Sequence, residues 1–253
     1  MNDDDSTMAI ITMLQSSRLR ASKIAESNHD KRADIWASDE TDDYVIEVKD
    51  KSPFKPTTTA QIEKGKILTS IETESYEYRN GIDGVLSDAA KQLARTVEVH
   101  PGFQLIWINL VCADTEMLRS QICFTWYGVE WLGWKENESG ENVTCLYFTH
   151  ASSFKNNNVV ALVMEDEDAT LAIHLNEFCP DLLRFRCTLF YDRFDRQLDP
   201  AEQVATGQAI AYTGSITRSN PQAVLEELGK AHQRSYYRSP LGRHTISSRY
   251  YNQ

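Results

Sequence analysis

The fold of this chain is decided by residues 33–49, which read ADIWASDETDDYVIEVK. Two apolar runs, residues 33–36 and residues 44–49, have the composition of β-strands. The segment between them, residues 38–43, consists of Ser, Asp, Glu and Thr, which is typical of a turn. We therefore predict a β-hairpin.

The predicted hairpin brings two carboxylates and an ammonium group together. In a symmetric hairpin Asp34 stands directly opposite Glu47, with Cβ atoms about 4.5–5.5 Å apart. The same register pairs Trp36 with Val45. Lys49 projects from the same face as Glu47, because strand side chains alternate between faces. Two carboxylates in contact repel unless a cation joins them, so the hairpin predicts a site for Mg²⁺ or Mn²⁺.

The pattern of Asp34 followed by Glu47-x-Lys49 resembles the PD-(D/E)xK nuclease superfamily, whose fold is restriction-endonuclease-like. The resemblance covers roughly residues 8–112. It implies an N-terminal helix, then this hairpin, then a further helix and strand. It also implies that Asp34 and Glu47 ligate a divalent metal together with the Val48 carbonyl. Lys49, by the same resemblance, orients the attacking water and stabilises negative charge.

Two further site residues rest on the same resemblance. Glu26 closes the first predicted helix, eight residues before Asp34, and a glutamate at this point in the family can face the metal. A solvated glutamate at a helix end is the alternative reading. Gln92 lies off the apolar stripe of the helix predicted over 85–98, and in the family a polar residue of this helix reaches the phosphate. The family's proline before the aspartate is Ala33 here.

Composition excludes several classes of protein. Of the 253 residues, 41% are hydrophobic and 25% are charged, as in ordinary globular proteins. We expect a cytoplasmic protein without membrane contact, because no apolar run is long enough to span a bilayer and the acidic N-terminus does not suit a signal peptide. Five scattered cysteines indicate reduced thiols rather than disulfides or a zinc site. No phosphate-binding glycine loop is present, so any ATPase activity would belong to a partner.

Nucleic acid is the expected partner, gripped at confined places. A net charge of −11 argues against tight non-specific binding over the whole surface. Lys51 and Lys55 lie in a locally basic stretch beside the proposed metal site, which is either a substrate-gripping flap or a solvated loop. The tail, residues 229–253, has five cations and no acidic residue. Its candidate contacts with nucleic acid are Arg234, Arg238 and Arg243, interleaved with tyrosines. The alternatives are a tail that docks on the protein's own acidic surface or on a partner.

Hydrophobic periodicity predicts the other elements. We predict helices over 7–26, 85–98, 114–126, 200–207 and 221–233. We predict strands over 103–111, 143–149, 159–164, 169–176 and 184–191. The segment 103–111 is predicted to be a buried central strand with at least one parallel neighbour. The predicted fold class is α/β, a mixed central β-sheet flanked by helices, with a restriction-endonuclease-like core (about 8–112) and an elaborated C-terminal half (113–228) in a single domain, 1–253.

These expectations converge on a metal-dependent nuclease that hydrolyses phosphodiester bonds, with DNA favoured over RNA as substrate. The resemblance suggests a restriction or antiviral defence system, with a protein partner such as a separate ATPase or helicase subunit. Two alternatives stay open. One is a catalytically silent subunit that keeps the nuclease fold for interaction. The other is an unrelated α/β binding module in which Glu47 and Lys49 merely pair. For the motif itself, the alternative to a metal site is an exposed edge hairpin with a surface ion pair.

Overall fold

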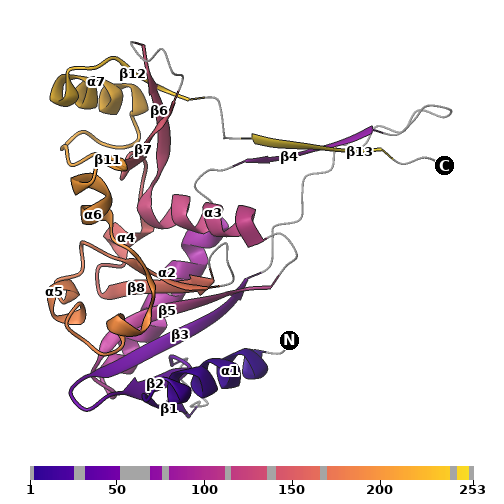
Figure 1. Cartoon of the computed structure of the whole chain (residues 1–253), viewed down its shortest axis with the longest axis vertical. Coiled ribbons are helices and arrows are strands. Elements are labelled where there is room, and N and C mark those ends of the chain that lie inside the picture. The colour runs from indigo at the N-terminus through magenta and orange to yellow at the C-terminus, as the bar shows by residue number, and fades with distance from the viewer. Residues whose placement is uncertain are drawn as a thin grey trace.

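The computed structural model describes residues 3–25, 32–51, 69–75, 80–111, 115–135, 141–165, 170–239 and 244–250 (Figure 1). Its helices are α1 (Asp3–Ser16), α2 (Asn80–Val97), α3 (Thr115–Tyr127), α4 (Ser152–Lys155), α5 (Leu182–Phe185), the 3₁₀ turn η1 (Tyr191–Arg193), α6 (Pro200–Ala205) and α7 (Pro221–His232). Its strands are β1 (Arg20–Lys23), β2 (Ile35–Ser38), β3 (Asp43–Lys51), β4 (Thr69–Ser75), β5 (Phe103–Leu110), β6 (Glu130–Trp134), β7 (Val143–Leu146), β8 (Val159–Glu165), β9 (Leu171–Leu175), β10 (Arg196–Leu198), β11 (Ala209–Ala211), β12 (Tyr236–Arg238) and β13 (His244–Tyr250).

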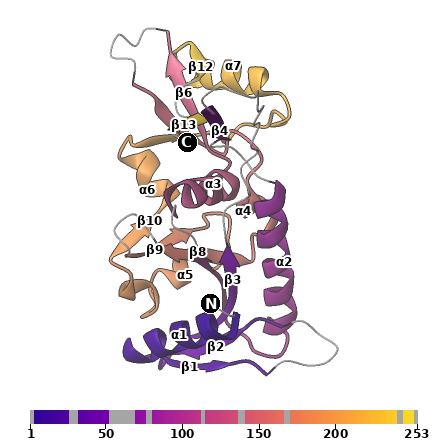
Figure 2. The ribbon, with the colours of Figure 1, turned by 90° about the vertical axis from the view of Figure 1, so that its right-hand side faces the viewer.

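A seven-stranded mixed sheet forms the centre, in the order β1-β2-β3-β5-β8-β9-β10. Strand β2 is antiparallel to both of its neighbours, β1 and β3, whereas β3, β5 and β8 run parallel. Helix α2 makes the crossover between the parallel neighbours β3 and β5 and covers one face of the sheet (Figure 2). The α/β class and the mixed central sheet flanked by helices are thus confirmed, as is the central position of the strand predicted over 103–111.

The β2–β3 hairpin has the predicted register. Trp36 pairs with Val45 as expected, and the ladder ends at the pair Ile35–Ile46. The side chain of Asp39 forms the turn: its Oδ1 accepts hydrogen bonds from the backbone N–H of Thr41 at 2.7 Å and from that of Asp42 at 2.8 Å. An aspartate that replaces backbone bonding in this way favours a turn over continued strand.

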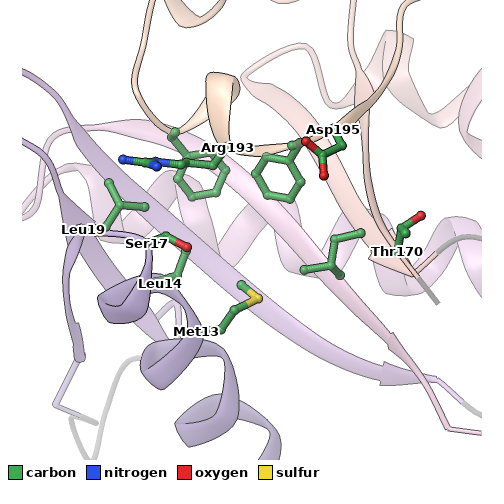
Figure 3. A pocket seen from close by; sticks show the side chains of 10 residues that line it. Met13, Leu14, Ser17, Leu19, Thr170, Arg193 and Asp195 are labelled. Atoms are coloured by element: carbon green, nitrogen blue, oxygen red, sulfur yellow. The ribbon is translucent and has the colours of Figure 1, made fainter.

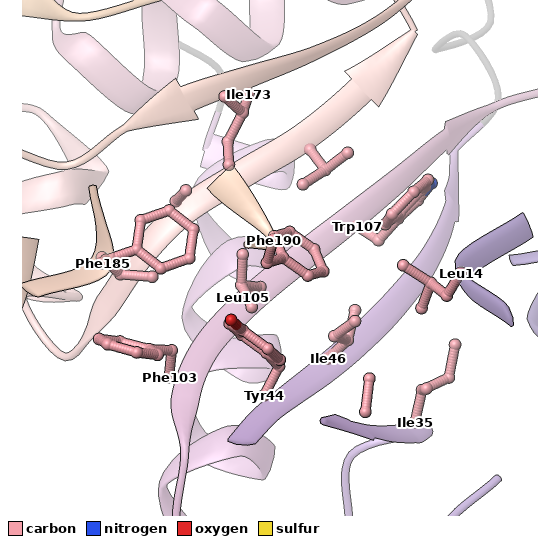
Figure 4. Close-up of a cluster of buried hydrophobic side chains, with 14 of the residues drawn as sticks. Leu14, Ile35, Tyr44, Ile46, Phe103, Leu105, Trp107, Ile173, Phe185 and Phe190 are labelled. Atoms are coloured by element: carbon pink, nitrogen blue, oxygen red, sulfur yellow. The ribbon is translucent and has the colours of Figure 1, made fainter. Parts of the chain in front are cut away.

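The alternation of β3 divides the core between the two faces of the sheet. Tyr44 and Ile46 point to the α1 face, where Leu14, Trp107 and Phe190 join them in one buried cluster (Figure 4). Val45 points to the other face, into the cluster formed by the apolar side of α2, which includes Ile82, Leu86, Ala89 and Leu93. A polar residue of β3 that shares the face of Val45 therefore lies beneath α2.

The C-terminal half adds a second layer to this core. A four-stranded sheet in the order β11-β7-β6-β12 packs against α7, and Leu132, Phe148, Val224 and Leu228 form its buried cluster. In Figure 1 this layer lies at the top, beyond α3 and α6. Strands β4 and β13 pair antiparallel as a separate ribbon.

The helix predicted over 7–26 is wrong in its second half. Helix α1 ends at Ser16, Arg18 adopts a left-handed backbone conformation (φ 66°), and β1 follows as the edge strand of the central sheet. The apolar spacing misled us because Ala21 fits both a helical stripe and the alternation of a strand that buries one face. The core prediction that started at residue 8 therefore contains one more strand than expected.

The strand predicted over 184–191 is also wrong. This segment holds the end of α5 and the start of η1, and Phe185 and Phe190 enter the α1-face cluster from turns rather than from a strand. Aromatic content favours strands only where a neighbouring strand is present to pair. The helices predicted over 85–98, 114–126, 200–207 and 221–233 correspond to α2, α3, α6 and α7, and the strands over 143–149, 159–164 and 169–176 to β7, β8 and β9.

Among the described helices, none combines the length and the apolar composition that a bilayer crossing requires.

Two glycines give a matched test of this packing. A Cβ atom added at Gly102 would lie 2.6 Å from the backbone oxygen of Asp43, where β3 and β5 begin side by side, so Gly102→Ala should lower the melting temperature. An added Cβ at Gly84, inside α2, meets nothing within 4 Å. Gly84→Ala should therefore stabilise the protein, by about 0.5–1 kcal/mol from helix propensity alone. Thermal unfolding followed by circular dichroism checks both. Equal effects of the two substitutions would contradict the close approach at Gly102.

Candidate functional site

The same alternation that buries Val45 brings Glu47 and Lys49 to the α2 face of the sheet. Glu47 is 1% exposed, and the ammonium group of Lys49 donates a hydrogen bond to its Oε1 as an ion pair. The Lys49 side chain is 26% exposed, so it connects the buried carboxylate with solvent. The reading as an exposed edge hairpin is wrong, because β3 lies inside the sheet between β2 and β5.

Asp34 is held by main-chain hydrogen bonds on both sides. Its N–H donates to the carbonyl of Ile46 at 3.2 Å, and its carbonyl accepts from the N–H of Ile24 at 2.8 Å. Its carboxylate Oδ2 accepts a further hydrogen bond from the N–H of Val48 at 2.8 Å. Asp34 thus sits just before β2, directly beside Glu47, with little freedom to move away.

Thr96 ties this position to helix α2. Its hydroxyl accepts a hydrogen bond from the N–H of Ala33 at 2.7 Å and donates one to the carbonyl of Gln92 at 2.8 Å. The Thr96 side chain is fully buried. The residue before Asp34 is therefore anchored to the helix that covers the site.

Burial raises the pKa of both carboxyl groups. Burial is the main cause for Glu47, the charge of Asp34 adds to it, and the hydrogen bond from Lys49 opposes them; the pKa of Glu47 reaches about 8. Burial also raises the pKa of Asp34, against the opposing effects of the Val48 N–H and of the charges on Lys49 and Lys23. Both carboxyl groups are thus buried more deeply than their charges favour, and the nearby cations offset this only in part.

The arrangement fits a divalent cation. Glu47 Oε2 is buried and has no hydrogen-bond partner among the described residues, so one carboxylate oxygen is left for a ligand. The carbonyl of Val48 points to the same strand edge as its N–H, beyond the end of β2, and thus beside Asp34. No group of three or more Asp, Glu, His or Cys side chains gathers in the part of the chain that the structure describes. Two carboxylates, a carbonyl and retained water molecules suit Mg²⁺ better than a metal that needs an all-protein cage.

The other predicted site residues differ in position. Gln92 is half-buried on α2, and its backbone carbonyl rather than its side chain makes the described contact. Lys51 ends β3 on the same face as Lys49, and burial lowers its pKa. Glu26 and Lys55 lie outside the described residues.

The basic tail is partly used by the fold itself. Arg238 Nε donates to Glu130 Oε2 at 2.7 Å, and the Arg234 guanidinium carbon lies 5.0 Å from the centre of the Trp134 ring. Arg243 falls outside the described ranges. The ion pair of Arg238 agrees with the reading in which the tail docks on the protein's own acidic groups.

A concavity lies on the opposite face of the sheet. It has a volume of about 320 Å³ and lies between α1, the start of β9 and η1. Figure 3 shows Met13 and Leu14 on one wall, with Arg193 and Asp195 at separate places on the other. Its lining is mainly apolar and lacks paired carboxylates, so it offers less chemistry than the site around Asp34.

Sequence reasoning missed two residues of the site. Lys23 lies within the helix predicted over 7–26, but β1 brings its charge close enough to affect the pKa of Asp34. Thr96 lies within the helix predicted over 85–98, and no local pattern signals that its hydroxyl bonds Ala33, 63 positions away in sequence.

Comparison with family models, with curated protein sequences and with solved structures found no match to this chain.

The raised pKa of Glu47 predicts how stability depends on pH without metal. Because its pKa rises from 4.5 in the unfolded chain to about 8 in the folded protein, the folded state binds the proton more tightly. Stability should therefore fall as pH rises from about 4.5 to 8, by ~1.4 kcal/mol for each unit of pKa difference that is realised. Glu47→Gln should remove this decline and be more stable than wild type at pH 8. Urea unfolding in EDTA at several pH values measures both. A decline that is equally steep in Glu47→Gln would contradict the shift.

Thr96 offers a second test of the site. Thr96→Val leaves the buried N–H of Ala33 without an acceptor, which should cost about 1–3 kcal/mol. Thr96→Ser keeps the hydroxyl and is the matched control. We also expect Thr96→Val, but not Thr96→Ser, to reduce the stabilisation that Mn²⁺ confers, because Asp34 loses its anchor. Differential scanning fluorimetry with and without Mn²⁺ gives both quantities. Equal Mn²⁺ responses in the two variants would limit Thr96 to a purely structural role.

Proposed function

We propose that this chain is a metal-dependent nuclease that hydrolyses phosphodiester bonds of nucleic acid. The observation that supports this best is the meeting of Asp34, Glu47 and Lys49 in the centre of the sheet, with one buried carboxylate oxygen of Glu47 left for a ligand. A structural ion pair explains Lys49 and Glu47, but it does not explain a second carboxylate held against them by three hydrogen bonds.

The residues divide the chemistry among them. Asp34, Glu47 and the Val48 carbonyl would hold Mg²⁺ or Mn²⁺, which when bound lowers the pKa of a coordinated water and stabilises charge on phosphate oxygens. Lys49 holds a positive charge between the buried Glu47 and solvent, where it stabilises the negative charge that develops on the phosphate group. The backbone clamp on Asp34 keeps the ligand geometry fixed before substrate arrives.

The order of elements also supports the proposal. Helix α1, the β2–β3 hairpin, helix α2 and the parallel strand β5 follow one another as the resemblance to the PD-(D/E)xK superfamily implies. The edge strand β1 is an addition before the hairpin. A restriction-endonuclease-like core is accordingly part of the proposal.

Substrate and context follow from the resemblance. DNA is favoured over RNA, within a restriction or antiviral defence system and beside a protein partner such as an ATPase or helicase subunit. The net charge of −11 suits an enzyme whose substrate is delivered or gripped locally rather than attracted by the whole surface.

A silent interaction subunit is the second candidate. The burial of Glu47 to 1% exposure favours it, since substrate phosphate has little direct access to that carboxylate. The two candidate functions share the fold and differ in whether the protein cleaves nucleic acid.

Cleavage assays separate the candidates. Purified protein should cut plasmid, linear DNA or RNA in Mg²⁺ or Mn²⁺, and EDTA should stop the reaction. Glu47→Ala and Lys49→Ala should abolish cutting, whereas Lys91→Ala should not, since Lys91 forms an exposed ion pair with Asp88 on the outside of α2. Full activity of Glu47→Ala or Lys49→Ala would contradict the site assignment.

Metal linkage tests the site without turnover. Mn²⁺ should stabilise the wild type by ~2.7 kcal/mol at 100 times its dissociation constant. Asp34→Asn should lose most of that gain. A metal response without cleavage of any substrate would support the silent subunit, and an unchanged response in Asp34→Asn would argue against a shared cation.

A further inference from the structure

The C-terminal layer contains an open groove of about 530 Å³ between α7, the end of β6 and β12. These three elements lie at the top of Figure 1, away from the central sheet. The charged and amide side chains along the groove are Lys135, Lys230, Arg234, Gln222, Gln233 and Glu226. Three of these are cations and one is an acid, which is unusual in a chain with a net charge of −11.

Several cations elsewhere in the molecule are paired with acids. Lys155 pairs with Asp83, Arg186 with Asp199, and Arg238 with Glu130. Lys135, Lys230 and Arg234 form no ion pair with a carboxylate in the described ranges. Their charges are thus available to an anion from outside.

The backbone holds the walls of the groove together. The N–H of Lys135 donates to the carbonyl of Ser235 at 3.1 Å, and the N–H of Arg234 donates to the carbonyl of Gly229 at 3.0 Å. A Cβ atom at Gly229 would lie 2.7 Å from the Arg234 oxygen, so this close approach requires glycine. Stacking on Trp134 orients the Arg234 guanidinium. The cations are therefore carried on a rigid frame.

The tyrosine that lines the groove, Tyr236, is not available for stacking on bases. Tyr236 is 9% exposed and belongs to the buried cluster of this layer. Tyr237 is 44% exposed, but it does not line the groove, and its ring lies over Gly133. Aromatic stacking on unpaired bases needs a free ring face. A nucleic acid in the groove would accordingly be contacted through its phosphates.

We propose that this groove binds the phosphate backbone of a nucleic acid strand, without base recognition. The inference rests on the proposed function, because it assigns a second contact to the substrate of that nuclease. The inference assigns the phosphate contacts to Lys135, Lys230 and Arg234. Arg238 is not among them, because it is paired with Glu130. Contacts of this kind position a strand, carry no sequence information, and weaken steeply with salt.

Charge reversal tests the groove. The variant Lys135→Glu/Lys230→Glu changes two exposed residues, and Arg184→Glu/Arg193→Glu changes the net charge equally at exposed positions near α5 and η1. Binding of a fluorescent single strand of about 20 nucleotides, longer than one typical binding site, is measured by anisotropy in EDTA. At about 50 mM salt we expect the groove variant to bind at least tenfold more weakly, with a log–log salt slope shallower by about 1.4. The control variant should keep the wild-type slope.

The outcomes separate this inference from the nuclease proposal. Lys230 lies in the last turn of α7, where a cation also stabilises the helix dipole. If Lys135→Glu/Lys230→Glu melts at a lower temperature but keeps the wild-type affinity and salt slope, the proposal that the groove binds phosphate is overturned. The lysines would then have a structural role only. Equally weakened binding in the groove variant and the control variant would also overturn the proposal, because the change in net charge would explain the result. If Glu47→Ala binds as the wild type does while no protein cuts any substrate, the nuclease proposal fails and the groove stands.

Discussion

Two carboxylates that repel each other are held in contact at the centre of this protein. Asp34 cannot retreat, because Ile24, Ile46 and Val48 hold it by hydrogen bonds from two neighbouring strands. Glu47 cannot retreat, because β3 lies between two other strands and its side chain is buried under α2. The raised pKa values record the cost of this arrangement. A cost of this kind is common where a site is prepared for a ligand that is absent.

The surrounding architecture can be understood from that constraint. The edge strand β1 supplies one clamp on Asp34, and α2 supplies another through Thr96 and Ala33. The apolar side of α2 excludes water from the face that carries Glu47, while Lys49 reaches solvent. On the opposite face of the sheet, α1 and the aromatic side chains of the C-terminal half pack against the strands. This packing holds the strands in place but does not take part in the site.

Charge is distributed to match this division. The chain as a whole is acidic, and several described cations, among them Lys155, Arg186 and Arg238, pair with acids within the fold. Lys135, Lys230 and Arg234, which lack such a partner among the described residues, line one groove beside α7, away from the central sheet. An acidic body with one confined basic groove would hold a polyanion in one orientation, since the rest of the surface repels it. Under the proposed function, the second layer would bind the strand that the first layer cleaves.

The amino-acid sequence by itself determined the hairpin, its register and the face that Glu47 and Lys49 share, because alternation and turn chemistry are local properties of the chain. It also placed α2, β5 and most later elements. It could not place β1 or the aromatic turns near Phe185, where one apolar spacing fits two structures and a distant neighbour decides between them. Only the tertiary structure decided that Glu47 is buried, that Thr96 anchors Ala33 and that Glu130 engages Arg238. These contacts join residues 63 and 108 positions apart, and no local pattern specifies such a pairing.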